Sequence, residues 1–182
     1  MKISIHHFIL FLIIALSNPF RGTSQDINKD SSLVTFEISN LGINMVDGTI
    51  KGFEGSVVFD PEDMSKSSFR VCIDPATINS GISARDEELL EEDYFNVEKY
   101  PGICFDSDYI IKTDGGFLTT GTLTLKGVSR EVTIPFVVQD NRLKGSLEIN
   151  RTDYGVGPSG GFLVGKTVEL EIICVLETSN PR

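Results

Sequence analysis

The chain has 182 residues, with 26 acidic and 16 basic side chains, a net charge of −10 at pH 7 and no tryptophan. An acidic surface of this kind repels nucleic acid, so a nucleic-acid partner is not expected. Both histidines, His6 and His7, lie in an N-terminal segment that we expect to be removed. The remaining protein then lacks the commonest general base and metal ligand, and we expect no metal, no cofactor and no catalytic apparatus.

The first 24 residues have the organisation of an export signal. A short basic region precedes an apolar run at residues 8–16, which is too short to span a bilayer. Small residues follow, so cleavage is expected after Ser17 or, preferably, after Ser24. We therefore expect residues 1–24 to be a signal peptide and residues 25–182 to form a single domain. This domain should be exported, periplasmic or secreted, and soluble rather than membrane-integral, because no later stretch approaches membrane-spanning length.

Apolar and polar residues alternate along most of the remaining chain. Val34, Phe36 and Ile38, for example, alternate with polar neighbours, which is typical of a strand with one buried face. Segments with this pattern lie near residues 33–40, 45–51, 54–60, 67–74, 102–111, 117–126, 130–139, 142–150 and 166–176. One of the two segments at 45–51 and 54–60 is expected to be a bent continuation of the other, which leaves about eight strands.

The connections between these segments are short and rich in turn residues. Asp47-Gly48, Asp114-Gly115-Gly116 and Lys126-Gly127 are examples, and they predict an up-and-down order of antiparallel strands. The expected fold is therefore all-β, an antiparallel β-barrel of about eight strands, and such barrels hold side chains or one small ligand. A sandwich of two sheets is the alternative.

One segment has the pattern of a short helix, around residues 84–95. Ser83 is the expected N-cap, because its side chain can accept a hydrogen bond from the first turn. The acidic residues that follow it are favourable near a helix N-terminus. The apolar residues of this segment are expected to cover one end of the barrel: Leu89, Leu90, Tyr94 and Phe95.

Several motifs occur in an order that resembles a known family. They are Gly42-Ile43 with Gly48–Gly55, then Ile73–Asn79, Arg85–Leu89 with Asp93–Pro101, Gly121–Arg130 and Asn150–Gly157. Together they cover about residues 32–176 and resemble the YceI-like family of exported polyisoprenoid-binding proteins with a lipocalin-like barrel. The resemblance implies that the barrel binds a long isoprenoid chain, such as a quinone tail or a polyprenyl phosphate, for transport, storage or stress protection. This chain has Asn40 and Glu88 where the family often has histidine.

The apolar residues that alternate inward are the candidate lining of a lipid-binding cavity. They are Phe36, Ile38, Ile73, Phe105, Leu123, Ile134, Phe136, Leu147, Ile149, Leu170 and Ile172. Alternation indicates which side chains face inward, but the same residues could fill a solid core. Three functions therefore stay open: a non-enzymatic lipid carrier, which we favour, a filled barrel that serves as a protein-interaction module, and a cofactor-independent enzyme acting on an apolar substrate.

The strand phase separates the three cysteines. Cys72 and Cys104 should point away from the apolar face, whereas Cys174 is in phase with inward residues. If a disulfide forms in an oxidising compartment, it should join Cys72 to Cys104; two unpaired thiols are the alternative. The pairs Arg85-Asp86 and Arg151-Asp153 are expected to fix the helix and the last hairpin to the barrel, with contacts to a ligand headgroup as the second possibility.

Overall fold

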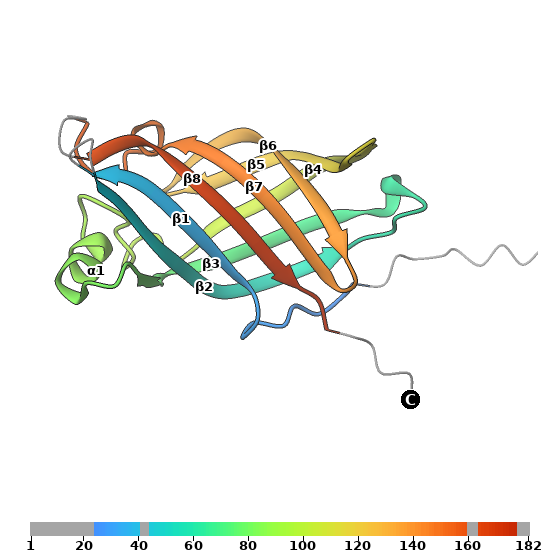
Figure 1. The fold of residues 1–182 in the computed structure, drawn as a ribbon, viewed down its shortest axis with the longest axis horizontal. Helices are drawn as coiled ribbons and strands as arrows, with labels where there is room; N and C mark the ends of the chain where they lie inside the picture. The colour runs from blue at the N-terminus through green and yellow to red at the C-terminus, as the bar shows by residue number, and fades with distance from the viewer. Residues whose placement is uncertain (1–23, 41–43, 160–163, 178–182) are drawn as a thin grey trace, which may run out of the picture.

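The computed structural model describes residues 24–40, 44–159 and 164–177. Their strands close into a barrel in which each strand pairs antiparallel with its neighbour in sequence and the last pairs with the first (Figure 1). The strands are β1 Leu33–Asn40, β2 Asn44–Val58, β3 Ser68–Asn79, β4 Ile103–Thr113, β5 Gly116–Leu125, β6 Val128–Gln139, β7 Arg142–Asn150 and β8 Val164–Val175. The all-β antiparallel barrel of eight strands expected from the alternating pattern is therefore confirmed.

The two segments at 45–51 and 54–60 belong largely to one strand, β2, which bends between them. Gly52 and Gly55 have φ values of 74° and 117° in this bend, a region that side chains disfavour. A Cβ atom at Gly55 would also lie 2.0 Å from the carbonyl oxygen of Arg70 on β3. The bend shifts the register with β3 and lets one long strand follow the curvature of the barrel.

The two ends of the barrel differ (Figure 1). At one end, here called the helix end, lie α1 (Ser83–Leu90) and the 3-10 helix η2 (Arg151–Tyr154). At the other, here called the aromatic end, the rings of Phe59, Phe69, Phe117 and Phe136 pack together, with four centroid distances between 5.0 and 5.8 Å. Residues 24–32, which precede β1, and the 3-10 helix η1 (Met64–Lys66) lie at this aromatic end. Of the helices that the structure describes, none is long and apolar enough to cross a membrane.

The helix α1 is shorter than the sequence pattern indicates. It ends at Leu90, and the expected cap Ser83 is its first helical residue, while Ile82 is the N-cap and makes no side-chain cap hydrogen bond. The early end has an electrostatic reason, because three acidic residues at 91–93 follow the helix, and negative charge is unfavourable at a helix C-terminus. Leu89, Leu90 and Phe95 nevertheless pack against buried residues of the barrel.

Two neighbouring pairs of strands are joined over only a short length. β3 pairs with β4 through four residue pairs, and β6 pairs with β7 through four. Between β6 and β7 the segment that includes η2 adds further contacts: Arg130 Nε of β6 donates to the carbonyl oxygen of Asp153 at 3.0 Å. Lys126 Nζ likewise donates to the carbonyl oxygen of Gly155 at 2.8 Å.

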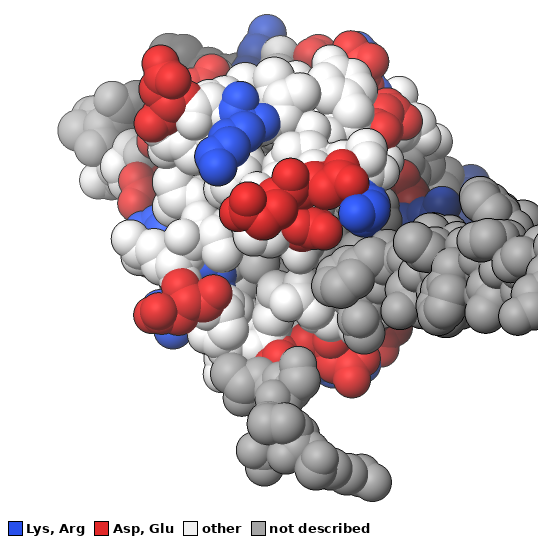
Figure 2. Space-filling model, turned by 90° about the vertical axis from the view of Figure 1, so that its right-hand side faces the viewer, with Lys and Arg blue, Asp and Glu red and all other residues white. Residues whose placement is uncertain are grey.

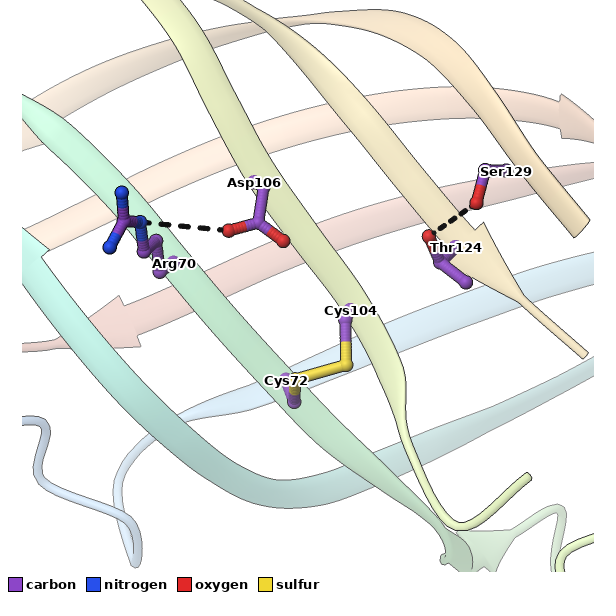
Figure 3. The surroundings of a disulfide bond; sticks show 6 residues. All are labelled: Arg70, Cys72, Cys104, Asp106, Thr124 and Ser129. Carbon is purple, nitrogen blue, oxygen red and sulfur yellow. Dashed lines mark hydrogen bonds and ion pairs between the residues drawn. A yellow bond between two sulfur atoms is a disulfide. The ribbon is translucent and has the colours of Figure 1, made fainter. Parts of the chain in front are cut away.

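A disulfide bond reinforces the short pairing between β3 and β4 (Figure 3). The register places Cys72 directly opposite Cys104, and the two are joined by a disulfide. Beside it, Arg70 Nε lies 3.8 Å from Asp106 Oδ1 across the same pair of strands. This ion pair is largely exposed and contributes little, so the covalent bond is the stronger link here.

Removing this disulfide should destabilise the protein. The bond closes a loop with a sequence separation of 32, which restricts the unfolded chain, and we expect a double variant Cys72→Ser/Cys104→Ser to lose about 3 kcal/mol of unfolding free energy. Urea unfolding measures this loss, and wild-type protein in reductant should reproduce it. Peptide mass mapping without reduction should give one linked pair, and a link that includes Cys174 would contradict the assignment.

Candidate functional site: an apolar cavity in the barrel

The barrel encloses a cavity of about 390 Å³. All eight strands contribute to its lining, and most of the lining side chains are aliphatic or aromatic. All eleven candidates from the sequence line it: Phe36, Ile38, Ile73, Phe105, Leu123, Ile134, Phe136, Leu147, Ile149, Leu170 and Ile172. The alternating pattern thus brings together, in one space, residues from strands that are far apart in the chain. Its volume lies in the range of small-molecule sites.

The sequence reasoning missed part of the lining. Val34 and Phe69 have the same alternating signal as the chosen residues and could have been found by it. Thr119 also lies in phase with Leu123 on β5 and lines the cavity, but a search for apolar residues passes over it. Other lining residues come from outside the strands, and a period of two gives no signal for them.

The lining becomes polar at the helix end. Arg85, Glu88 and Tyr94 from the α1 region and Arg151 from η2 line the cavity here. Glu88 is exposed to solvent, so the cavity reaches water at this end. Burial raises the pKa of Tyr94, and the nearby Glu88 carboxylate raises it further while Arg151 opposes the shift. Tyr94 is therefore a neutral hydroxyl at neutral pH.

Arg85 holds α1 against the barrel. Its Nε donates to Ser80 Oγ at 2.7 Å, and its Nη2 donates to the carbonyl oxygen of Ser80 at 2.6 Å. The Asp86 carboxylate in turn accepts a hydrogen bond from the backbone N–H of Ser80 at 2.8 Å. Both charged residues thus bind one residue just beyond β3 instead of each other, and this links α1 to the barrel end.

Arg151 is buried, with 5% of its surface exposed. Its guanidinium donates to four backbone carbonyl oxygens: Val156 at 2.6 Å, Gly165 at 2.8 Å, Pro158 at 3.1 Å and Val164 at 3.2 Å. All four acceptors belong to the glycine-rich segment 155–165, and they lie before and after its residues 160–163, which are outside the described part of the chain. Because four of its five N–H donors bind carbonyl oxygens of this segment, Arg151 is placed mainly to hold the segment.

The third cysteine lines the cavity as a small apolar group. Cys174 is a free, buried cysteine, and burial raises the pKa of its thiol to about 11. At neutral pH the thiol keeps its proton and is a poor nucleophile. Within the described residues no three or more His, Cys, Asp or Glu side chains are grouped so as to hold a metal ion.

Replacing Arg151 by lysine should destabilise the protein, although the substitution keeps the positive charge. A lysine ammonium has three donors and no planar fork, so it cannot bind all four carbonyl groups, and buried hydrogen bonds to a charged donor are costly to lose. We expect Arg151→Lys to lower the unfolding free energy by about 3 kcal/mol or more. Urea unfolding measures this, and hydrogen exchange should show weaker protection near η2.

The matched control is Arg130→Lys. Arg130 is exposed and donates to a single carbonyl oxygen, that of Asp153 in η2, so its replacement should change stability by less than about 1 kcal/mol. Equal losses in the two variants would contradict the role given to Arg151.

Comparison with known proteins identifies the family. The model of the YceI-like domain matches residues 26–176, a range that begins in the N-terminal segment and includes every strand of the barrel. The chain belongs to the YceI-like family. This confirms the family that the ordered motifs suggested.

Among curated proteins, a UPF0312 protein of Photorhabdus laumondii is 36% identical over 107 residues, which are 59% of this chain and 56% of that protein. A UPF0312 protein of Serratia proteamaculans is 33% identical over 134 residues, 74% of this chain and 63% of that protein. The chain thus matches less than two thirds of the length of either relative.

Solved structures share the barrel of this YceI-like chain. BcnA of Burkholderia cenocepacia has a TM-score of 0.77 at 27% identity, covering 84% of this chain and all of that one. A YCEI protein of Campylobacter jejuni has a TM-score of 0.65 at 24% identity, covering 78% of this chain and 91% of that one. A polyisoprenoid-binding domain from Saccharophagus degradans has a TM-score of 0.64 at 14% identity, covering 85% and 97%.

Proposed function

We propose that this YceI-like protein binds one long apolar lipid chain, of the isoprenoid class, inside its barrel and carries or stores it without chemical change. The observation that carries the proposal is the cavity itself, whose lining is almost continuously apolar over all eight strands. A filled core would leave no such space. The barrel of the Saccharophagus degradans neighbour, which is named as polyisoprenoid-binding, supports the same ligand class.

The shape of the site favours a chain over a compact molecule. The cavity begins among polar groups at the helix end and continues between apolar walls towards the aromatic end. Each additional carbon that enters leaves water and contacts these walls, so binding should strengthen with length until the cavity is full. At about 0.3 kcal/mol per heavy atom, every ten carbons that enter the cavity supply about 3 kcal/mol.

Affinity should therefore increase with chain length. We expect native protein extracted with organic solvent to release a long-chain lipid, identified by mass spectrometry. The stripped protein should bind prenyl alcohols of increasing length progressively more tightly, as measured by displacement of a fluorescent probe. Equal affinity for short and long chains, or no lipid either recovered or taken up, would count against a hollow, lipid-binding barrel.

A pair of variants on β7 separates cavity binding from surface adsorption. Leu147 lines the cavity, while Ser146 beside it faces solvent. We expect Leu147→Asp to weaken lipid binding about 100-fold or more, because an ionised group must lose its water when the chain enters. Ser146→Asp adds the same charge outside and should leave binding intact. Circular dichroism must show that both variants are folded.

We also propose that residues 1–24 direct export and are then removed. Residues 1–23 lie outside the described part of the chain, so this proposal rests on the sequence pattern. The Cys72–Cys104 disulfide supports it, because such bonds persist in oxidising compartments.

Fractionation and N-terminal sequencing test the export proposal. We expect the mature protein outside the cytoplasm, with its first residue near Gln25. Replacing two leucines of the apolar run by arginine should trap the uncut chain inside the cell, because the run would no longer be apolar. Wild-type protein found in the cytosol with Met1 still present would contradict the proposal.

A further inference from the structure

One polar atom deep in the barrel has no partner. Of the residues that the structure describes, two have a buried side-chain oxygen without a hydrogen-bond partner, Gln25 and Thr119. Thr119 is 3% exposed and lines the cavity, whereas Gln25 does not. A buried hydroxyl without a partner costs free energy, so this position calls for a group that can complete it.

The surroundings of Thr119 are apolar. The strand register places it between Ile110 on β4 and Ile134 on β6, and the next inward pair towards the aromatic end is Phe117 and Phe136. The adjacent hydroxyl of Thr120 differs, because it shares a hydrogen bond of 2.9 Å with Thr133. On this part of β5, therefore, the threonine that faces the cavity lacks a hydrogen-bond partner, whereas its outward-facing neighbour has one.

The charged lining groups are far from Thr119. Arg85, Glu88 and Arg151 all belong to the helix end. On β5 this end corresponds to Leu125, which packs with Tyr154 and Val156 of the η2 region. Leu125 and Thr119 are six positions apart on an extended strand, a span of roughly 20 Å. An anion brought next to Thr119 would find no cation in the lining there, and its burial would be unfavourable.

The outer surface of the aromatic end also disfavours an anion near Thr119. Acidic side chains outnumber basic ones on the visible face of this end (Figure 2). The loop between β2 and β3 lies here and carries three acids, Asp60, Glu62 and Asp63, against one basic residue, Lys66. The field at this end therefore disfavours negative charge, although water screens much of it.

We propose that Thr119 is an anchor for an uncharged oxygen at the leading end of the ligand, a carbonyl or a hydroxyl, with the apolar chain extending back to the helix end. The inference rests on the proposed lipid binding and specifies the class and direction of the lipid. A carbonyl needs only the one donor that Thr119 offers. A buried water needs two to four polar partners, and neighbouring Ile110, Ile134 and Phe136 offer none from their side chains.

The test compares two probes of equal chain length, heptadecane and 2-heptadecanone, delivered from cyclodextrin to the stripped protein. Thr119→Val keeps the shape of the side chain and removes the hydroxyl, whereas Thr119→Ser keeps the hydroxyl. We expect Thr119→Val to weaken ketone binding about fivefold to tenfold relative to heptadecane, the effect of one neutral hydrogen bond. Thr119→Ser should retain the wild-type ratio of the two affinities.

The outcomes separate this inference from the proposed function. If wild-type protein binds neither probe, the lipid-binding function itself fails. If it binds heptadecane but Thr119→Val leaves the affinity ratio unchanged, lipid binding stands and the anchor is wrong. Palmitate, an anion, tests whether the anchored oxygen is uncharged. If palmitate binds more tightly than 2-heptadecanone and loses this advantage in Thr119→Val, the proposal of an uncharged oxygen is wrong. The unfolding free energy of empty Thr119→Val should be unchanged or higher, since a partnerless hydroxyl is removed.

Discussion

The pairing of β1 with β8 is the constraint on which the structure depends. Val34 lies opposite Ile172 and Phe36 opposite Leu170, so the first and last strands complete one sheet with no free edge at this seam. Once the sheet is closed, alternate side chains of every strand must face the same interior. The apolar set is then enclosed whatever its detailed packing, and an interior incompletely filled by side chains becomes a cavity with apolar walls.

Closure alone leaves two weak seams, where β3 meets β4 and β6 meets β7 over short lengths. Each is supported by means other than strand pairing. The disulfide crosses the first. At the second, Arg130 of β6 and Lys126 of the turn before it bind the backbone of the η2 region, and Arg151 fixes the chain that follows η2 to the start of β8. These links maintain the wall where the backbone ladder does not.

The sequence predicted those features that depend on periodicity. Eight strands, the bend in β2 and eleven inward side chains follow from a repeat of two, because closure leaves each strand only two faces. Other features depend on distances between segments remote in the chain. The four carbonyl partners of Arg151 are one example. The choice between a hollow and a filled barrel is another, since alternation carries no information on unfilled volume.

The distribution of polarity along the cavity limits which lipids fit. At the helix end the cavity reaches water beside Glu88, so an end group left there can remain hydrated. At Thr119 the walls provide a single neutral donor among apolar neighbours. A molecule charged at both ends, or one polar along its whole length, would have to bury groups that the walls cannot satisfy. A single apolar chain with polarity confined to its ends satisfies both the walls and the hydroxyl.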